Sequence, residues 1–284
     1  MSKKKYVPHA WESVDCPFCS YQQSKLSEKY GSELQFTYVE CLDCGLIYQS
    51  PRPKYDEVFL RDAYEEYFHF DQDYTYSAKN LGQWSQELRE IFKFDKHRSA
   101  ILDIGSCMGD FLKVAQDYYP HCVGMDVAEN MANFTVDQLG VQVHVGKYAE
   151  WNFKEKFSCI HMSHVIEHIP NPNEWVQKTR SLLDKDGILV MSIPNRNALD
   201  NRLKLFLKRI GLRKGAWKDN SRTPDHLFEP TIQSTLKFFA ANGFHVLEYY
   251  TYSSKDVDAS TFWGRIYNRK LKLGGSMRFF VTAA

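Results

Sequence analysis

The sequence predicts an α/β protein with a doubly wound, mostly parallel sheet, together with a small cysteine-rich module. From residue 99 onward, short apolar runs alternate with amphipathic helical patterns, and a glycine turn follows the first run. Strands that alternate with helices in this way form βαβ units. Two C-x2-C pairs precede this region, between residues 16 and 44.

The expected elements follow from apolar periodicity and from the turn residues that end each run. Ala100–Ile104 is an apolar run closed by Gly105, which predicts a strand and a tight turn, and Gly187 and Gly243 end two later helical patterns. The expected strands are 100–104, 121–125, 141–145, 157–162, 188–193, 244–250 and 276–283, and the expected helices are 85–97, 110–119, 129–139, 173–183 and 230–242.

Three parts are expected along the chain. Residues 1–54 form a zinc-binding module, 55–98 form an aromatic-rich helical lid or linker, and 99–284 form the α/β domain. A basic insertion at 196–229 interrupts that domain on the side where an acceptor would bind.

Composition indicates a globular protein in a reducing compartment. The 284 residues are 43% hydrophobic and 25% charged, with a formal net charge of +1, which is ordinary for a globular chain. No apolar run reaches the roughly 18 residues of a membrane-spanning helix, and the basic N-terminus lacks the apolar stretch of a secretory signal. We therefore expect a cytoplasmic protein with reduced cysteines, in which Cys107, Cys122 and Cys159 are small buried hydrophobic residues.

The turn after the first expected strand is predicted to bind a ligand. Asp103, Gly105 and Gly109 stand where this strand becomes the first helix, where glycine allows a tight turn and a helix N-terminus favours negative groups. The G-x-G-x-x-G spacing of dinucleotide sites is absent, which favours a ligand with a carboxylate and an ammonium. Asp103 would hold a bound water or an amino group, and Asp126, at the end of the second strand, would accept both ribose hydroxyls.

These residues carry a resemblance to a known family. The run 101–112, ILDIGSCMGDFL, resembles the first motif of class I S-adenosylmethionine-dependent methyltransferases, and Asp126 matches the ribose-binding acid of that family. The resemblance implies a Rossmann-like sheet of seven strands with the last strand antiparallel. It also implies S-adenosylmethionine as cofactor, held by Asp103, Gly105, Ser106, Gly109, Asp126, Val127, Tyr148, Ala149 and Ser163.

One residue departs from the family pattern in this loop. Cys107 stands where the family has its middle glycine. Because cysteine disfavours a positive φ, we expect the loop to pass this position with ordinary backbone angles.

Histidines and a carboxylate follow the fourth expected strand in the segment Ser163-His164-Val-Ile-Glu167-His168. This segment resembles the motif that lines the junction of cofactor and acceptor in small-molecule methyltransferases. A histidine there is either a general base, since imidazole titrates in the useful range, or part of a loop that the polar residues only cap and order. The H-x-x-E-H spacing also matches a zinc-peptidase motif, but the prolines at 170 and 172 would end the helix that such a site needs.

The two cysteine pairs predict a structural zinc site in a zinc ribbon. Cys16, Cys19, Cys41 and Cys44 follow the pattern C-x2-C-x21-C-x2-C, close to that of four-cysteine zinc sites. Such modules also bind nucleic acid, but residues 10–50 carry only two lysines against six acidic residues, and a negative module is a poor phosphate binder. Some sugar-modifying methyltransferases look similar, with a cysteine-rich module before the catalytic domain.

The basic insertion predicts an anionic partner. From Arg196 to Arg222 there are nine Lys or Arg and two acids. Apolar residues recur there at helical spacing, which indicates a basic amphipathic helix: Leu199, Leu203, Phe206, Leu207 and Ile210. Basic residues near the final hairpin are expected to add charge: Arg265, Arg269, Lys270, Lys272 and Arg278. The alternatives are a solvated face, a phosphate-bearing or lipid-linked acceptor, an anionic membrane surface, and RNA.

Methyl transfer from S-adenosylmethionine is the leading interpretation, with an O or C atom of a small, anionic, carbohydrate-type or lipid-linked molecule as acceptor. His164, Glu167 and His168 would border the acceptor, and so would His226, which lies in a segment that resembles the acceptor side of related methyltransferases. An RNA methyltransferase with a zinc ribbon and a non-enzymatic adaptor are the alternatives, and the oligomeric state is not predicted.

Overall fold

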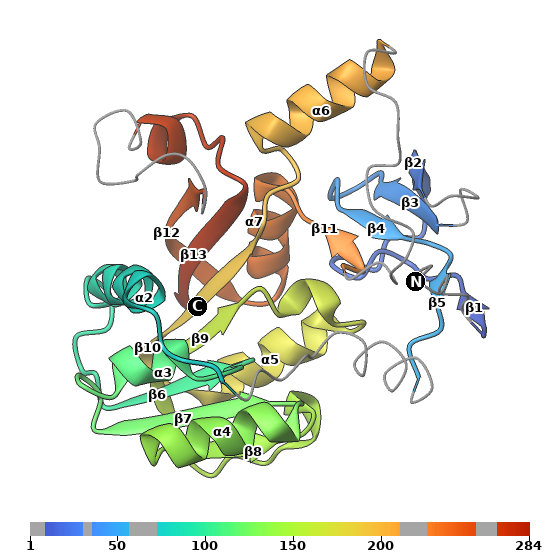
Figure 1. Cartoon of the computed structure of the whole chain (residues 1–284). Coiled ribbons are helices and arrows are strands. Elements are labelled where there is room, and N and C mark those ends of the chain that lie inside the picture. Colours follow the sequence, from blue (N-terminus) through green and yellow to red (C-terminus); the bar gives the residue numbers. More distant parts are fainter. Residues whose placement is uncertain (1–8, 31–35, 57–72, 211–225, 254–265) are drawn as a thin grey trace.

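The computed structural model describes residues 9–30, 36–56, 73–210, 226–253 and 266–284 of the chain. One sheet has seven strands in the order β12-β13-β10-β9-β6-β7-β8 (Figure 1). They are β6 (Ala100–Ile104), β7 (His121–Asp126), β8 (Gln142–Val145), β9 (Phe157–Ser163), β10 (Leu183–Pro194), β12 (Phe244–Tyr252) and β13 (Ser276–Ala283). The strands from β6 to β10 pair in parallel, and β13 is antiparallel to both β10 and β12. The predicted Rossmann-like sheet with an antiparallel last strand is confirmed.

Helices cover both faces of this sheet. They are α2 (Ala78–Ile91), α3 (Asp110–Ala115), α4 (Glu129–Leu139), α5 (Pro172–Leu182) and α7 (Ile232–Ala241). A further helix, α6 (Leu199–Arg209), extends away from the sheet (Figure 1). Alternate residues of β6 serve the two faces, as the two-residue period of a strand requires. Ile101 packs with Leu88 of α2 and Phe111 of α3, whereas Leu102 packs in the core that includes Phe239 of α7.

Three helix boundaries differ from those predicted by more than two residues; one of them is the end of α2, at Ile91 rather than at residue 97. The helix expected at 85–97 is α2, which starts earlier because the Ser77 side chain caps it by accepting a hydrogen bond from the Asn80 N–H at 3.1 Å. α3 ends at Ala115 rather than at residue 119, because the chain turns and buries Tyr119, whose hydroxyl donates to Asp95 at 2.8 Å.

The cysteine-rich region forms a second, smaller sheet in the order β11-β4-β3-β2. Its strands β2 (Ser24–Tyr30), β3 (Phe36–Cys41) and β4 (Ile47–Gln49) come from the N-terminal region, and a short ribbon pairs β1 (Trp11–Glu12) with β5 (Arg52–Pro53). The edge strand β11 (Phe228–Glu229) comes from far along the chain, at the end of the predicted basic insertion (Figure 1). We call β1 to β5 with their four cysteines the four-cysteine module. Its sheet includes β11 as an edge strand, although β11 lies outside the predicted limits of 1–54.

Parts of every predicted region lie outside the described residues. These are 1–8 and 31–35 of the zinc-binding module, 57–72 of the linker, and 211–225 and 254–265 of the α/β domain, of which 211–225 belongs to the basic insertion. The described part of the insertion begins with α6, which extends away from the rest of the chain at the top of Figure 1. Among the helices that the structure describes, none is both long and apolar enough to cross a membrane.

Candidate active site

Glycines shape the loop between β6 and α3, which we call the donor loop (residues 105–110). Gly105 and Gly109 have φ angles of 76° and 79°, a region that glycine adopts readily. A Cβ on Gly105 would lie 2.5 Å from Cγ2 of Val165, and one on Gly109 would lie 2.6 Å from Cγ2 of Thr135. Both positions therefore require glycine, for the backbone angle and for space.

Cys107 corrects two expectations. Its φ is 47°, so the loop does not pass this position with ordinary angles, and its side chain is exposed rather than buried. Two hydrogen bonds hold the residue in this conformation: its N–H donates to Asp126 Oδ2 at 2.8 Å, and its carbonyl accepts from the Thr135 hydroxyl at 3.0 Å. Cys122 and Cys159 are buried, as predicted.

Asp126 stands at the end of β7, directly beside the donor loop. Its second oxygen, Oδ1, accepts from the Ala128 N–H at 2.9 Å, and only 5% of the residue is exposed. Burial raises the pKa of this carboxyl group. Nearby, Ser106 Oγ is buried and has no hydrogen-bond partner among the described residues. The loop thus offers a fixed carboxylate and a free hydroxyl to a polar ligand.

Asp103 belongs to a buried charged network that sequence reasoning missed. Its Oδ1 lies 2.7 Å from Nδ1 of His161, the residue directly opposite it on β9. Nε2 of His161 lies 3.3 Å from Glu87 Oε1, and Arg278 donates to Glu87 Oε2 at 2.5 Å. The sequence does contain a sign of this network, because Asp103 and His161 are polar residues inside apolar strand-like runs. A polar side chain is buried in such a strand only when a hydrogen-bond or ion-pair partner is buried with it.

This network has well-defined protonation states. Burial alone would lower the pKa of the His161 imidazole, but the carboxylates of Asp103 and Glu87 outweigh it and raise the pKa to about 9. For Glu87, burial is outweighed by Arg278 and His161, and the pKa falls below its usual value. His161 is therefore a cation at neutral pH, held between two carboxylates.

The network also changes the expected basic patch near the final hairpin. Arg278 was expected to add surface charge, but it is only 9% exposed and is paired with Glu87. Arg269 is also neutralised, by ion pairs with Glu90 and Glu248. Because acidic residues compensate their charges, Arg278 and Arg269 do not form an anion-binding surface. Arg265 lies outside the described residues.

The remaining predicted donor residues lie around the same edge of the sheet. Val127 is 42% exposed, next to Asp126, and Ser163 ends β9. Tyr148 is buried, and its hydroxyl lies 3.0 Å from Thr179 Oγ1 of α5. The carbonyls of Tyr148 and Ala149 both accept hydrogen bonds from the Lys178 ammonium.

The predicted catalytic residues come together around one carboxylate, and we call them the histidine cluster: His164, Glu167, His168 and His226. Glu167 is fully buried. Its Oε1 lies 3.2 Å from His164 Nδ1 and 4.0 Å from His226 Nε2, and the rings of His168 and His226 are 5.0 Å apart in an edge-to-face arrangement. His226 is distant in sequence, and its place beside the motif was not evident from spacing.

Electrostatics keeps Glu167 ionised. Burial raises the pKa of a carboxyl group, but the hydrogen bond with His164 and the neighbouring His168 and His226 outweigh it, so the pKa of Glu167 is lowered. Its Oε2 is buried with no hydrogen-bond partner among the described residues. A buried carboxylate of this kind orients an imidazole through one ring nitrogen and leaves the other free to take a proton.

His164 has the geometry of such an imidazole. Its side chain is 41% exposed, and its Nε2 lies 3.3 Å from the Tyr252 hydroxyl. The residue has a φ of 56°, and its N–H donates to the Ser192 carbonyl at 2.8 Å. Only a single 3-10 turn, Ile166–His168, follows, so the helix that the zinc-peptidase motif needs is absent here.

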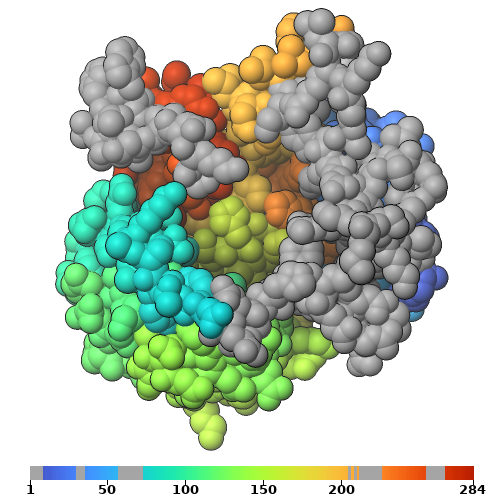
Figure 2. Space-filling view, in the orientation of Figure 1, coloured from blue at the N-terminus to red at the C-terminus, as the bar shows by residue number. Residues whose placement is uncertain are grey.

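Figure 2 shows that this face of the molecule is hollowed at its centre, with a floor in the yellow-green of the segment from β9 to α5. The histidine cluster lies in that segment, except for His226. Val165, next to His164, is also the side chain nearest to Gly105 of the donor loop. The donor loop and the histidine cluster are therefore immediate neighbours.

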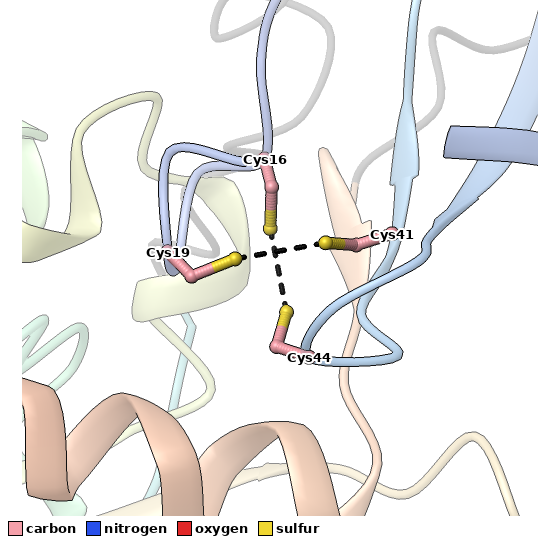
Figure 3. A group of neighbouring side chains, drawn as sticks. All are labelled: Cys16, Cys19, Cys41 and Cys44. Carbon is pink, nitrogen blue, oxygen red and sulfur yellow. Dashed lines mark hydrogen bonds between the residues drawn. The ribbon is translucent and has the colours of Figure 1, made fainter. Parts of the chain in front are cut away.

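The four cysteines of the module point their sulfurs at one another (Figure 3). Cys16 Sγ lies 3.4 Å from Cys44 Sγ, and Cys19 Sγ lies 3.6 Å from Cys41 Sγ. All four thiols are free, and the four sulfurs lie within 4.8 Å of one another. In a tetrahedral site with Zn–S bonds of about 2.3 Å, sulfurs are about 3.8 Å apart, so this arrangement fits zinc.

Residues 76–249 match a family described as a methyltransferase domain. This stretch is more than half of the 284-residue chain, and the chain belongs to that family. Together with the Rossmann-like sheet and the donor loop, this makes the protein an S-adenosylmethionine-dependent methyltransferase.

Curated proteins are similar in sequence to part of this chain. A ubiquinone biosynthesis O-methyltransferase of Ruegeria sp. is 26% identical over 178 residues, which cover 59% of this chain and 71% of that protein. The protein of the same name from Glaesserella parasuis is 46% identical over 111 residues, covering 34% of this chain and 46% of its own length. The shared part thus ranges from 46% to 71% of the length of these two relatives.

Solved structures share the fold. An S-adenosylmethionine-dependent methyltransferase from Clostridium acetobutylicum has a TM-score of 0.50 and 11% identity, covering 75% of this chain and 93% of that one. Magnesium protoporphyrin IX methyltransferase from Synechocystis, solved with S-adenosylhomocysteine bound, has a TM-score of 0.52 and 16% identity, covering 81% and 100%. These similarities concern the fold alone.

Proposed function

We propose that the protein transfers a methyl group from S-adenosylmethionine to a hydroxyl oxygen of its acceptor, and that a histidine oriented by Glu167 removes the hydroxyl proton. The observation that carries this proposal is the fully buried, ionised Glu167 with His164 and His226 around it. An acidic carbon in place of the hydroxyl would need the same base.

His164 is the best-placed base of the cluster. With its Nδ1–H donated to Glu167 at 3.2 Å, its Nε2 is the proton-accepting nitrogen. The acceptor hydroxyl would take the place of the Tyr252 hydroxyl, which lies 3.3 Å from Nε2. As the proton moves to Nε2, the imidazolium that forms is stabilised by the Glu167 carboxylate. The acceptor oxygen then takes the methyl group, and the sulfonium sulfur keeps the bonding electron pair as S-adenosylhomocysteine leaves.

The donor loop and Asp126 are the proposed binding site for S-adenosylmethionine, which supplies an electrophilic methyl group on a sulfonium sulfur when bound. Asp126 would accept the ribose hydroxyls, Ser106 would pair with a polar group of the methionine part, and Asp103 with His161 would fix the local charge. Much of catalysis would come from holding the two reactants in line.

The acceptor is proposed to carry a lipid or other apolar part beside an anionic group. Apolar side chains form an exposed stripe along α6, with Leu203 and Phe206 exposed by 54% and 57%, and Ile210, directly after the helix, is exposed by 48%. The same helix contains Arg202, Lys204, Lys208 and Arg209 in its sequence. A basic helix with an exposed apolar face suits an anionic lipid surface, and the relatives named for ubiquinone biosynthesis agree with a lipid-type acceptor.

The cysteine cluster is proposed to hold one structural zinc ion. Four thiolates complete a tetrahedron and leave no open position for chemistry. The ion would therefore order the four-cysteine module, and its removal is treated below.

An acceptor screen tests the proposed reaction. Radiolabelled S-adenosylmethionine is incubated with alkyl catechols, nucleotide sugars, a glycolipid extract and transfer RNA, and labelled products are counted. We expect labelling of a hydroxyl compound, reduced about 100-fold or more by His164→Gln, with unchanged binding of S-adenosylhomocysteine. The exposed histidine variant His245→Gln is the control. If none of the variants His164→Gln, His168→Gln and His226→Gln reduces the labelling, the proposal that a histidine is the general base is refuted. If RNA is the only labelled compound, the acceptor is RNA and not a small hydroxyl compound.

Vesicle sedimentation tests whether α6 binds an anionic lipid surface. Wild-type protein should sediment with vesicles that contain phosphatidylglycerol and not with neutral ones, and Leu203→Ser with Phe206→Ser should abolish this. Leu26, which is also exposed (61%) but lies in β2, provides the matched control Leu26→Ser. Equal sedimentation of all variants would show that α6 does not contact the lipid.

A further inference from the structure

We infer that the four-cysteine module is a positioning part of the acceptor site, because it holds His226 and, through Leu227, the loop that carries Glu167. The inference rests on the proposed function for the role of these two residues. The contacts themselves extend in an unbroken chain from the module's β-sheet to the histidine cluster.

Backbone hydrogen bonds form the first part of this chain. β11 pairs antiparallel with β4, so that Phe228 lies opposite Tyr48. One residue earlier, the Leu227 carbonyl accepts from the Gln49 N–H at 2.9 Å, while the Leu227 N–H donates to the Glu167 carbonyl at 2.8 Å. The segment that carries His226 is therefore bonded on one side to the module and on the other to the Glu167 turn.

Two module side chains fix the His226 backbone directly. The His226 carbonyl accepts one hydrogen bond from the Gln49 side-chain amide and a second from the Tyr38 hydroxyl, both at 2.7 Å. Gln49 is 1% exposed, and its Oε1 has no hydrogen-bond partner in the described part of the chain. An unsatisfied buried acceptor destabilises the folded state. Leucine would fill this space without that cost, so the amide serves to place His226.

A buried ion-pair triad joins the same elements at a second point. Arg196, at the start of the predicted insertion, donates to Glu28 of β2 at 2.7 Å and to Glu229 of β11 at 2.5 Å. Arg196 is only 6% exposed. Removing one partner of a buried pair leaves an uncompensated charge, so these three segments are held together as a unit.

Apolar packing makes the module continuous with the catalytic core. Phe18, between the first two cysteines, stacks on Phe238 of α7 with ring centroids 4.1 Å apart and meets Phe228 edge to face at 5.0 Å. The cysteine sulfurs belong to the same buried cluster. Phe18 thus connects the first cysteine pair directly to β11, the strand that follows His226.

Hydrogen–deuterium exchange read by mass spectrometry tests the inference without requiring an acceptor. Gln49→Leu and Tyr38→Phe should speed deuterium uptake several-fold in peptides that cover 226–229 and 164–168. Uptake in 100–110 and the affinity for S-adenosylhomocysteine should stay as in the wild type. Gln23→Leu and Tyr21→Phe make the same chemical changes at exposed positions of the module, and should leave every peptide unchanged.

A second readout reports on His226 itself and covers the case in which Gln49→Leu fails to fold. The rate at which diethyl pyrocarbonate modifies His226 should rise in Tyr38→Phe and in wild-type protein treated with a zinc chelator, while the rate at His245 stays constant. Unchanged exchange at 226–229 and unchanged modification of His226 would overturn the inference. This result is independent of the acceptor screen, so that failure of the base proposal alone would leave the positioning role standing.

Discussion

At the scale of single residues, backbone conformation decides what the donor loop tolerates. Gly105 and Gly140 both have a positive φ, but a Cβ would meet Val165 at 2.5 Å at the first position and nothing within 4 Å at the second. We therefore predict that Gly140→Ala costs about 1 kcal/mol of unfolding free energy from its backbone angle alone. Gly105→Ala should cost about 2 kcal/mol more, because overpacking is added.

Urea denaturation measures both costs, and Val165→Ala supplies a further check. In the Gly105→Ala background, Val165→Ala should recover most of the overpacking cost, because it removes the Cγ2 atom that clashes. Equal costs for the two glycine substitutions would show that the close approach of the donor loop to the segment after β9 is wrong.

His161 predicts a pH dependence of stability. Its folded-state pKa, about 9, lies above the usual 6.5, so protonation favours the folded state. The resulting stabilisation is fully present below about pH 6.5 and is lost as the pH rises toward 9. Relative to His161→Asn, wild-type protein should lose a few kcal/mol of unfolding free energy over this window. Parallel pH profiles for the two proteins would refute the charged state of His161.

Residues whose chemistry is local could be predicted from the sequence, and those that depend on pairing could not. Gly105, Gly109 and Asp126 lie at strand ends, where a turn and an acid are readable from spacing. His161 faces Asp103 only because the register of β6 and β9 places them opposite each other. Cys107 was predicted wrongly, since hydrogen bonds with Asp126 and Thr135 outweigh its preference for a negative φ.

At the scale of elements, a buried ion pair joins α2 to the far edge of the sheet. Arg278 of β13 pairs with Glu87 of α2, and both are buried. We predict that Arg278→Met lowers the unfolding free energy by about 3–5 kcal/mol, because it removes one partner of a buried ion pair and leaves His161 to compensate both Glu87 and Asp103. Arg269→Gln removes half-exposed pairs and should cost no more than about 1 kcal/mol. Similar losses for the two variants in urea denaturation would contradict this distinction.

Strands were more predictable than helix limits. Apolar runs such as 100–104 and 276–283 match β6 and β13 to the residue, because buried strands need continuous apolar sequence. α2 begins at Ala78 through the cap at Ser77, before its apolar pattern becomes regular. β11 has two residues and was not predicted; its pairing with β4 depends on tertiary contacts that no local pattern records.

At the scale of the whole molecule, the four-cysteine module and the methyltransferase domain share one core. Since the cysteines lie in the same buried cluster as β9, β10 and α7 residues, metal removal should affect the whole fold. We predict one zinc per chain, and a fall in Tm on chelation of roughly 2–4 °C for each kcal/mol lost. Cys41→Ser should lose both zinc and stability, whereas Cys107→Ser should retain them. Full zinc content in Cys41→Ser would refute the site.

The chain's division into parts was predictable only in outline. Spacing identified a cysteine-rich module and an α/β domain, because metal knuckles and βαβ units have local signatures. The junction between them depends on Arg196, Gln49 and Tyr38, whose partners are far away in sequence. Only the folded arrangement therefore places His226 next to Glu167.

Calorimetric titration with S-adenosylhomocysteine is the most direct test that the donor loop and Asp126 form the cofactor site. Wild-type protein should bind one equivalent, and Asp126→Ala should bind about 10- to 100-fold more weakly, since hydrogen bonds to a charged group contribute about 1.5–3 kcal/mol. Asp117→Ala, an exposed carboxylate in the turn after α3, should bind like the wild type. If Asp126→Ala binds as tightly as the wild type, the cofactor lies elsewhere and the assignment of the active site is wrong.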